Sequence, residues 1–67
     1  MADKINILGF SQEKLEEFFI DIDEPKFRAT QLLKWVHQYG ELNFENMLNF
    51  SKDLRKKLQD IAILKPP

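Results

Sequence analysis

Three cations near the end of the chain, Lys52, Arg55 and Lys56, have the type and spacing needed to bind an anion. Residues three and four apart share one face of an α-helix, and Gln59 continues the same row. Lysine and arginine in such a row can neutralise nucleic-acid phosphates, and arginine can also donate two hydrogen bonds to one phosphate. The row is equally typical of a helix face that meets only water. The pattern alone leaves both interpretations open.

A second group of cations belongs to the most distinctive stretch of the chain, residues 25–40. Its members are Lys26, Arg28 and Lys34. On a helical projection Arg28 lies beside Trp35 and Tyr39, where its guanidinium would stack on an aromatic ring or reach a phosphate. The two rings share a stripe with leucine and valine, and we therefore expect both of them in the hydrophobic core.

The sequence lacks the usual parts of a catalytic or metal centre, because it contains one histidine and no cysteine. His37 is expected to face water, and a single imidazole without further ligands does not make a zinc site. Glu13, Glu16 and Glu17 are spread along one helix, whereas a hard cation needs several oxygens that converge. The two glycines stand too far apart for a phosphate-binding loop. We expect no catalytic, cofactor-binding or metal-binding residues in this segment.

Two long helices are expected to position the second cationic group. The first begins at Ser11, whose hydroxyl can accept a backbone N–H in the first turn, and ends at Asp23-Glu24-Pro25. The second covers residues 27–39, with Gly40 as the left-handed residue after its end. The predicted apolar faces are Leu15, Phe18, Phe19 and Ile22 in the first helix, and Ala29, Leu32, Leu33, Trp35, Val36 and Tyr39 in the second.

A short helical turn over residues 43–48, capped by its first asparagine, and a last helix capped by Ser51 complete the prediction. Core positions are assigned to Phe44, Met47 and Leu48 in the turn, and to Leu54, Leu58, Ile61 and Ala62 in the last helix. Residues 5–8 and 62–64 are short extended candidates, and two such pieces are hardly enough for a sheet. The predicted fold class is all-α, a small compact bundle of three helices plus the short turn.

Length and composition predict one small domain, residues 1–67. No apolar run approaches the ~18 residues of a membrane span, and the N-terminus lacks the pattern of a signal peptide. A chain without cysteine fits a reducing compartment, so we expect a cytoplasmic protein. We also expect it to be monomeric and to make no membrane contact. Residues 65–67, which end in two prolines, are expected to begin a linker to a further domain.

Charge is unevenly distributed along the chain, although the net charge is only −1. Residues 1–24 carry two cations and seven carboxylates, which gives −5. Residues 25–67 carry eight cations and four carboxylates, which gives +4. This asymmetry favours a polyanionic partner for the basic part of the chain.

A series of short motifs covers nearly the whole chain, namely Pro25-x-Phe27-Arg28-Ala29-x-Gln31-Leu32-x-Lys34-Trp35, Tyr39-Gly40, Phe44-x-x-Met47 and Ser51-Lys52-x-Leu54-Arg55-x-x-Leu58. In order and interval this series resembles the N-terminal domain of the radical-SAM adenosine C2 RNA methyltransferases of the RlmN type. His37 stands where that family usually has an aromatic residue, and Thr30 where it often has an acidic one.

The resemblance implies an accessory domain, helix-hairpin-helix-like, that helps to hold an RNA substrate. A barrel-like catalytic domain would follow it and would carry a Cys-x-x-x-Cys-x-x-Cys motif for a [4Fe–4S] cluster. That domain would bind S-adenosylmethionine and methylate C2 of adenosine in 23S rRNA and tRNA. The present segment would not catalyse the reaction by itself. The candidate RNA contacts are Lys26, Arg28, Lys34, Lys52, Arg55 and Lys56. The alternative is a structural module that docks on the catalytic domain without touching RNA.

Overall fold

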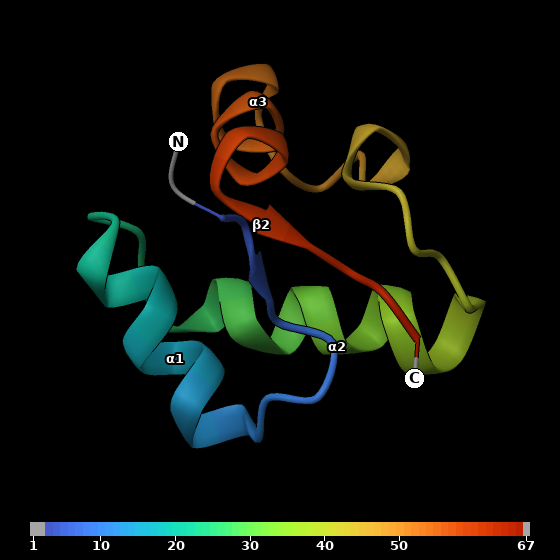
Figure 1. Ribbon diagram of the computed structural model, residues 1–67, viewed down its shortest axis with the longest axis horizontal. Coiled ribbons are helices and arrows are strands. Elements are labelled where there is room, and N and C mark those ends of the chain that lie inside the picture. Colours follow the sequence, from blue (N-terminus) through green and yellow to red (C-terminus); the bar gives the residue numbers. More distant parts are fainter. Residues whose placement is uncertain (1–2, 67) are drawn as a thin grey trace.

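Three α-helices lie around a short pair of strands that the two ends of the chain form (Figure 1). This computed structural model describes residues 3–66. The elements are β1 (Ile5–Asn6), α1 (Gln12–Asp21), α2 (Phe27–Tyr39), the 3₁₀ helix η1 (Phe44–Asn46), α3 (Lys52–Ile61) and β2 (Ala62–Ile63). Helix α1 packs against α2, while α3 packs against η1 and continues directly into β2.

The pairing of β1 with β2 is parallel, and it corrects the prediction of a purely helical fold. Ile5 is opposite Ala62 and Asn6 is opposite Ile63, and the N–H of Ile7 donates to the carbonyl of Ile63 at 3.0 Å. The Asn6 amide reinforces the pair: it donates to the carbonyl of Lys65 at 2.9 Å and accepts from the N–H of Lys65 at 3.1 Å. Two strands of two residues are stable here because side-chain hydrogen bonds and buried neighbours extend the contact.

The predicted helix termini are confirmed. The Ser11 hydroxyl accepts the N–H of Lys14 at 3.2 Å, and the Ser51 hydroxyl accepts the N–H of Leu54 at the same distance. Gly40 ends α2 with φ 64° and ψ 23°, the left-handed conformation that costs glycine nothing sterically. Local chemistry at these residues therefore sets the starts of α1 and α3 and the end of α2.

Apolar side chains from every element except the exposed strand β1 form the hydrophobic core. The 3₁₀ helix η1 contributes Phe44. The core comprises Ile7, Leu15, Phe18, Phe19, Ala29, Leu32, Phe44, Met47, Phe50, Leu54, Leu58, Ala62 and Leu64. Phe19 and Phe50, from opposite halves of the chain, place their ring centroids 6.1 Å apart. This contact joins the α1–α2 pair to the segment that leads into α3.

Two predicted core residues lie at the surface. Leu48 is 74% exposed, because Met47 and Phe50 on either side take the interior positions of that turn. Tyr39 is 58% exposed, because α2 ends at this residue and its ring packs on Trp35 rather than on the core. Ala62 is buried as predicted, although it belongs to β2 and not to the last helix.

Within residues 3–66, no helix is both long and apolar enough to span a membrane. Lys65 and Pro66 have no regular secondary structure. The predicted linker also includes Pro67, which lies outside the described part of the chain. Met1 and Ala2, which the prediction of no signal peptide concerns, lie outside it as well.

Candidate nucleic-acid interface

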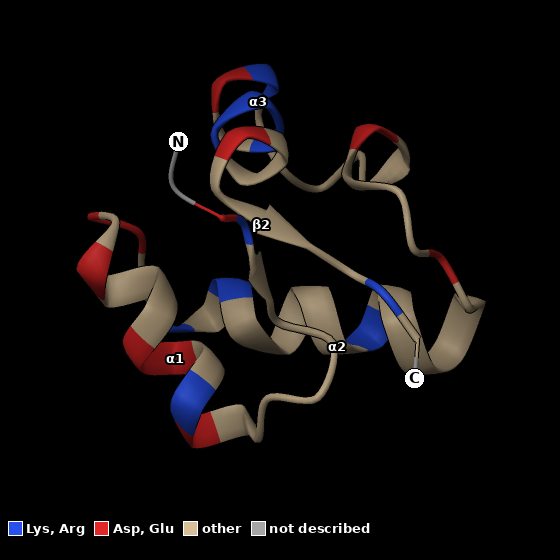
Figure 2. Ribbon diagram, viewed as in Figure 1, with Lys and Arg blue, Asp and Glu red and all other residues tan. Residues whose placement is uncertain are grey.

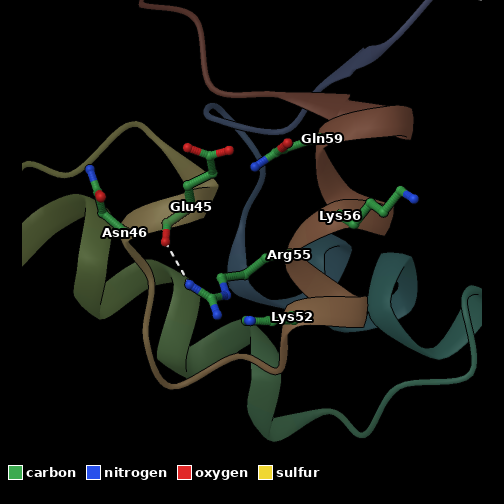
Figure 3. A pocket seen from close by; sticks show the side chains of 6 residues that line it. All are labelled: Glu45, Asn46, Lys52, Arg55, Lys56 and Gln59. Carbon is green, nitrogen blue, oxygen red and sulfur yellow. Dashed lines mark hydrogen bonds between the residues drawn. The ribbon is translucent and has the colours of Figure 1, made fainter.

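The cationic row of α3 forms one wall of a groove, and η1 forms the other (Figure 3). This α3–η1 groove has a volume of about 580 Å³. Its lining residues are Glu45, Asn46, Lys52, Arg55, Lys56 and Gln59. Because the Ser51 cap fixes the start of α3, the four α3 members at i, i+3, i+4 and i+7 share one face, as the spacing predicts.

Arg55 is the most constrained side chain in the groove. Its Nη1 donates to the main-chain carbonyl of Glu45 at 2.7 Å, which ties α3 to η1. Its Nε is buried and has no hydrogen-bond partner among residues 3–66. A buried donor without a partner costs about 1–3 kcal/mol. The bond to Glu45 therefore holds the guanidinium in place, while the buried Nε is closed to any ligand and only the other guanidinium N–H groups can serve one.

Lys52 and Lys56 are exposed, and neither makes an ion pair with the residues that the structure describes. In Figure 3 the ammonium of Lys52 points toward the guanidinium of Arg55, whereas Lys56 extends away from η1. The Glu45 side chain is the one carboxylate that lines the groove. Three cations against one carboxylate leave the α3–η1 groove positive, which suits a phosphate.

The second predicted group does not come together as one site. The Nε of Arg28 donates to Glu24 at 3.4 Å and its Nη1 donates to Gln31 at 2.9 Å. The guanidinium carbon lies 4.8 Å from the ring centroid of Phe27 and 5.9 Å from that of Phe50. The prediction that Arg28 stacks on Trp35 or Tyr39 is thus wrong. The guanidinium instead bonds to Glu24 and Gln31 and lies over the rings of Phe27 and Phe50. Its contact with RNA stays a prediction.

Lys34 lines a different groove on α2, while Lys26 lines neither groove. This α2 groove has a volume of about 550 Å³ and is lined by Phe27, Thr30, Gln31, Lys34, Trp35, Tyr39 and Asn49. Sequence reasoning missed it as a site, because it assigned the rings to the core. A usable signal was present: apolar residues cover a wider arc of α2 than one neighbouring helix can bury.

Acidic residues occupy several positions along α1 (Figure 2). Among residues 3–66 no group of three or more histidine, cysteine, aspartate or glutamate side chains could hold a metal ion.

The fold and this charge arrangement can be set beside known proteins. Residues 5–64 match the family described as the ribosomal RNA large subunit methyltransferase N-terminal domain. The chain belongs to this family. A dual-specificity RNA methyltransferase RlmN from Saccharophagus degradans is 56% identical over 59 residues, which cover 88% of this chain and 15% of that protein. The RlmN protein of a Marinomonas species is 55% identical over 64 residues, which cover 96% of this chain and 17% of that protein.

The family fold is also found in a solved structure. A radical SAM methyltransferase from Sphaerobacter thermophilus matches with a TM-score of 0.85 at 24% identity, over 92% of this chain and 18% of that one. At this identity the likeness establishes the fold. The chain spans less than a fifth of the length of each of these relatives. It therefore corresponds to one N-terminal domain of larger methyltransferases.

Proposed function

We propose that this domain contacts the RNA substrate of a radical-SAM methyltransferase through the α3–η1 groove. Membership of the family and the names of the RlmN relatives support an RNA substrate. The observation that carries the assignment to this groove is the guanidinium of Arg55, which its bond to the Glu45 carbonyl holds on the same face of α3 as Lys52 and Lys56.

The remainder of the full-length protein would supply catalysis in this proposal. It would hold the [4Fe–4S] cluster and S-adenosylmethionine, and would methylate C2 of adenosine in 23S rRNA and tRNA in the cytoplasm. The domain described here would position the RNA. The cofactor ligands would come from that remainder.

The chemistry of the groove fits a phosphodiester. Arginine bound through one N–H to a carbonyl can still donate others to a phosphate oxygen, and Lys52 adds a mobile positive charge beside it. Such contacts read the backbone and not the bases. With two or three phosphates engaged, the logarithm of the binding constant should fall with the logarithm of salt with a slope of about −1.4 to −2.1.

A titration of the chain with an RNA stem-loop, followed by backbone amide shifts at low and physiological salt, tests this proposal. We expect salt-sensitive shifts at Lys52, Arg55 and Lys56, and a weaker affinity with a smaller salt slope in the double variant Lys52→Gln/Lys56→Gln. Arg55 is left intact because it also ties α3 to η1. The double variant Lys4→Gln/Lys14→Gln, in the acidic first part of the chain, removes the same two charges elsewhere and should bind RNA normally. An equal loss of RNA affinity in the test variant and in the control would refute RNA binding in the α3–η1 groove.

Glu45 offers a test of opposite sign. Its carboxylate lines the same groove and repels a bound phosphate, so Glu45→Gln should strengthen RNA binding. An exposed charge pair is worth about 0.2–1 kcal/mol, which corresponds to a gain of about 1.4- to fivefold. A loss of affinity in this variant would contradict phosphate binding beside Glu45.

The exposed rings of Phe27 and Tyr39 favour a second candidate, a module that docks on the rest of the enzyme without contacting RNA. In that case the separate domain would bind the remainder of a full-length relative in the absence of RNA. It would show no amide shifts with RNA even at low salt. The two candidates therefore predict different partners in the same titration.

A further inference from the structure

The α2 groove exposes two aromatic rings that lie outside the core, and a third ring, Trp35, that packs against it. Phe27 is 54% exposed and Tyr39 is 58% exposed, while Trp35 is half-buried beneath them. The ring centroids of Trp35 and Tyr39 lie 5.1 Å apart, with their planes tilted by 51°. Aromatic surface of this extent normally marks a contact with another molecule.

Polar groups accompany the rings. The carbonyl oxygen of the Gln31 side chain is held by Arg28 at 2.9 Å, which leaves the NH₂ end of this amide without a partner among residues 3–66. The Asn49 amide also lines the groove and makes no side-chain hydrogen bond within the described part of the chain. Lys34 adds a positive charge. The groove therefore combines flat rings, two amides, of which Arg28 orients that of Gln31, and one cation.

We propose that the α2 groove binds an unpaired nucleobase of the RNA, which deepens the proposed function and rests on it. Unpaired bases stack on aromatic side chains and offer hydrogen-bonding edges to amides, and a neighbouring phosphate can meet a lysine. A groove of about 550 Å³ is within the range of small-ligand sites. An apolar protein segment would leave the amides of Gln31 and Asn49 unpaired, which is the reason to favour a base.

The two grooves then have different tasks. The α3–η1 groove binds phosphate whatever the sequence or pairing of the RNA. The α2 groove requires a base that has left its stack, so it selects loops and single strands over duplex. A domain with both would hold RNA at a place where the bases are unpaired.

The test uses Trp35, the one tryptophan of the chain, as a fluorescent reporter. We expect a single-stranded oligoadenylate to quench Trp35 emission, and a fully paired RNA of equal length to leave it unchanged. Loss of one stacking partner in Tyr39→Ala should weaken oligoadenylate binding by about tenfold, within the effect of removing a base-stacking ring. Tyr39→Phe keeps the ring and should bind nearly as the parent does. Ile20→Ala, a truncation at a 46% exposed residue of α1, is the matched control and should also bind normally.

Asn49→Ala is a second variant, which removes an exposed side chain and leaves the rings in place. It should weaken oligoadenylate binding while the far-ultraviolet circular dichroism spectrum stays unchanged. RNA binding that depends on Lys52 and Lys56 would support the proposed function. If oligoadenylate then leaves Trp35 emission unchanged, and Tyr39→Ala binds it as tightly as the parent, the base site is refuted and the proposed function stands. Absence of any RNA binding refutes both. If the Tyr39→Ala protein binds RNA normally but no longer binds the remainder of a full-length relative, the α2 groove is a domain interface and the base site is refuted.

Discussion

The Asn6 side chain joins the two ends of the domain, and its removal gives a prediction that can be worked out from the structure. Its amide donates to the carbonyl of Lys65, while Oδ1 accepts from the N–H groups of Lys65 and Leu8 at 3.1 and 3.2 Å. Two of the three bonds connect residues 59 positions apart in the chain. Asn6→Ala removes all three bonds without changing the backbone.

The expected loss of stability follows from the number and exposure of these bonds. An intramolecular hydrogen bond contributes about 0.5–1.5 kcal/mol net, and the low end applies here because all three are exposed. The sum is about 1.5 kcal/mol of unfolding free energy. A domain of this size has only a few kcal/mol in total, so the midpoint of thermal unfolding should fall by about 6–12 °C.

Thermal unfolding followed by circular dichroism measures this shift, and amide hydrogen exchange locates it. The N–H groups of Leu8 and Lys65 should exchange faster in Asn6→Ala, since both lose their acceptor. Asn46→Ala is the control, because Asn46 is exposed and its side chain makes no hydrogen bond with residues 3–66. A midpoint within about 2 °C of the parent, with unchanged exchange at these two amides, would refute the idea that Asn6 holds the strands together.

Three further changes test the core and the helix termini. Leu58→Ala empties a fully buried position and should cost about 2–5 kcal/mol, enough to leave much of the protein unfolded at 25 °C by circular dichroism. Gly40→Ala places a Cβ at φ 64° and should cost about 1 kcal/mol in denaturant unfolding, whereas Gly9→Ala, which meets nothing within 4 Å, should change the midpoint little. Ser51→Ala removes the cap of α3 and should cost about 1 kcal/mol, while Ser51→Asp keeps an acceptor and should restore the midpoint.

The helices could be predicted from the sequence because their signals are local. A serine hydroxyl accepts an N–H three residues away at the start of α1 and of α3, and Gly40 takes its left-handed conformation directly after α2. The periodic spacing of Leu15, Phe18 and Phe19 requires no knowledge of the rest of the chain. The interactions that define these helices therefore lie within one or two helical turns of each residue.

The strand pair could not be predicted in this way, because each strand is two residues long and its partner is at the other end of the chain. Nothing in residues 5–8 or 62–64 alone indicates that they meet. The decisive contact is the Asn6 amide, whose type is more typical of turns than of strands. Its role is visible only once the helices have brought both ends together.

The candidate site was predicted in part, for a similar reason. The row on α3 follows from helical spacing, and the structure places Lys52, Arg55 and Lys56 along one groove. The partners that decide how the other residues behave could not be predicted from spacing. Arg28 is captured by Glu24 and Gln31, and the ring of Tyr39 emerges into solvent where α2 ends. A helical projection shows which side a residue faces, but not whether a neighbour covers that side.

Under the proposed function, the distribution of charge in space is what would let a chain of net charge −1 attract RNA. The carboxylates of α1 and the cations of α3 lie on different elements (Figure 2). The domain measures 32 × 27 × 24 Å, whereas charges are screened over about 8 Å at physiological salt. A phosphate in the α3–η1 groove therefore responds mainly to the local cations and to Glu45. At about 0.01 M salt the screening length reaches about 30 Å, so α1 repels the same phosphate across the whole domain. Binding measured at physiological salt thus reports on the groove, while binding at very low salt also reports on the net charge.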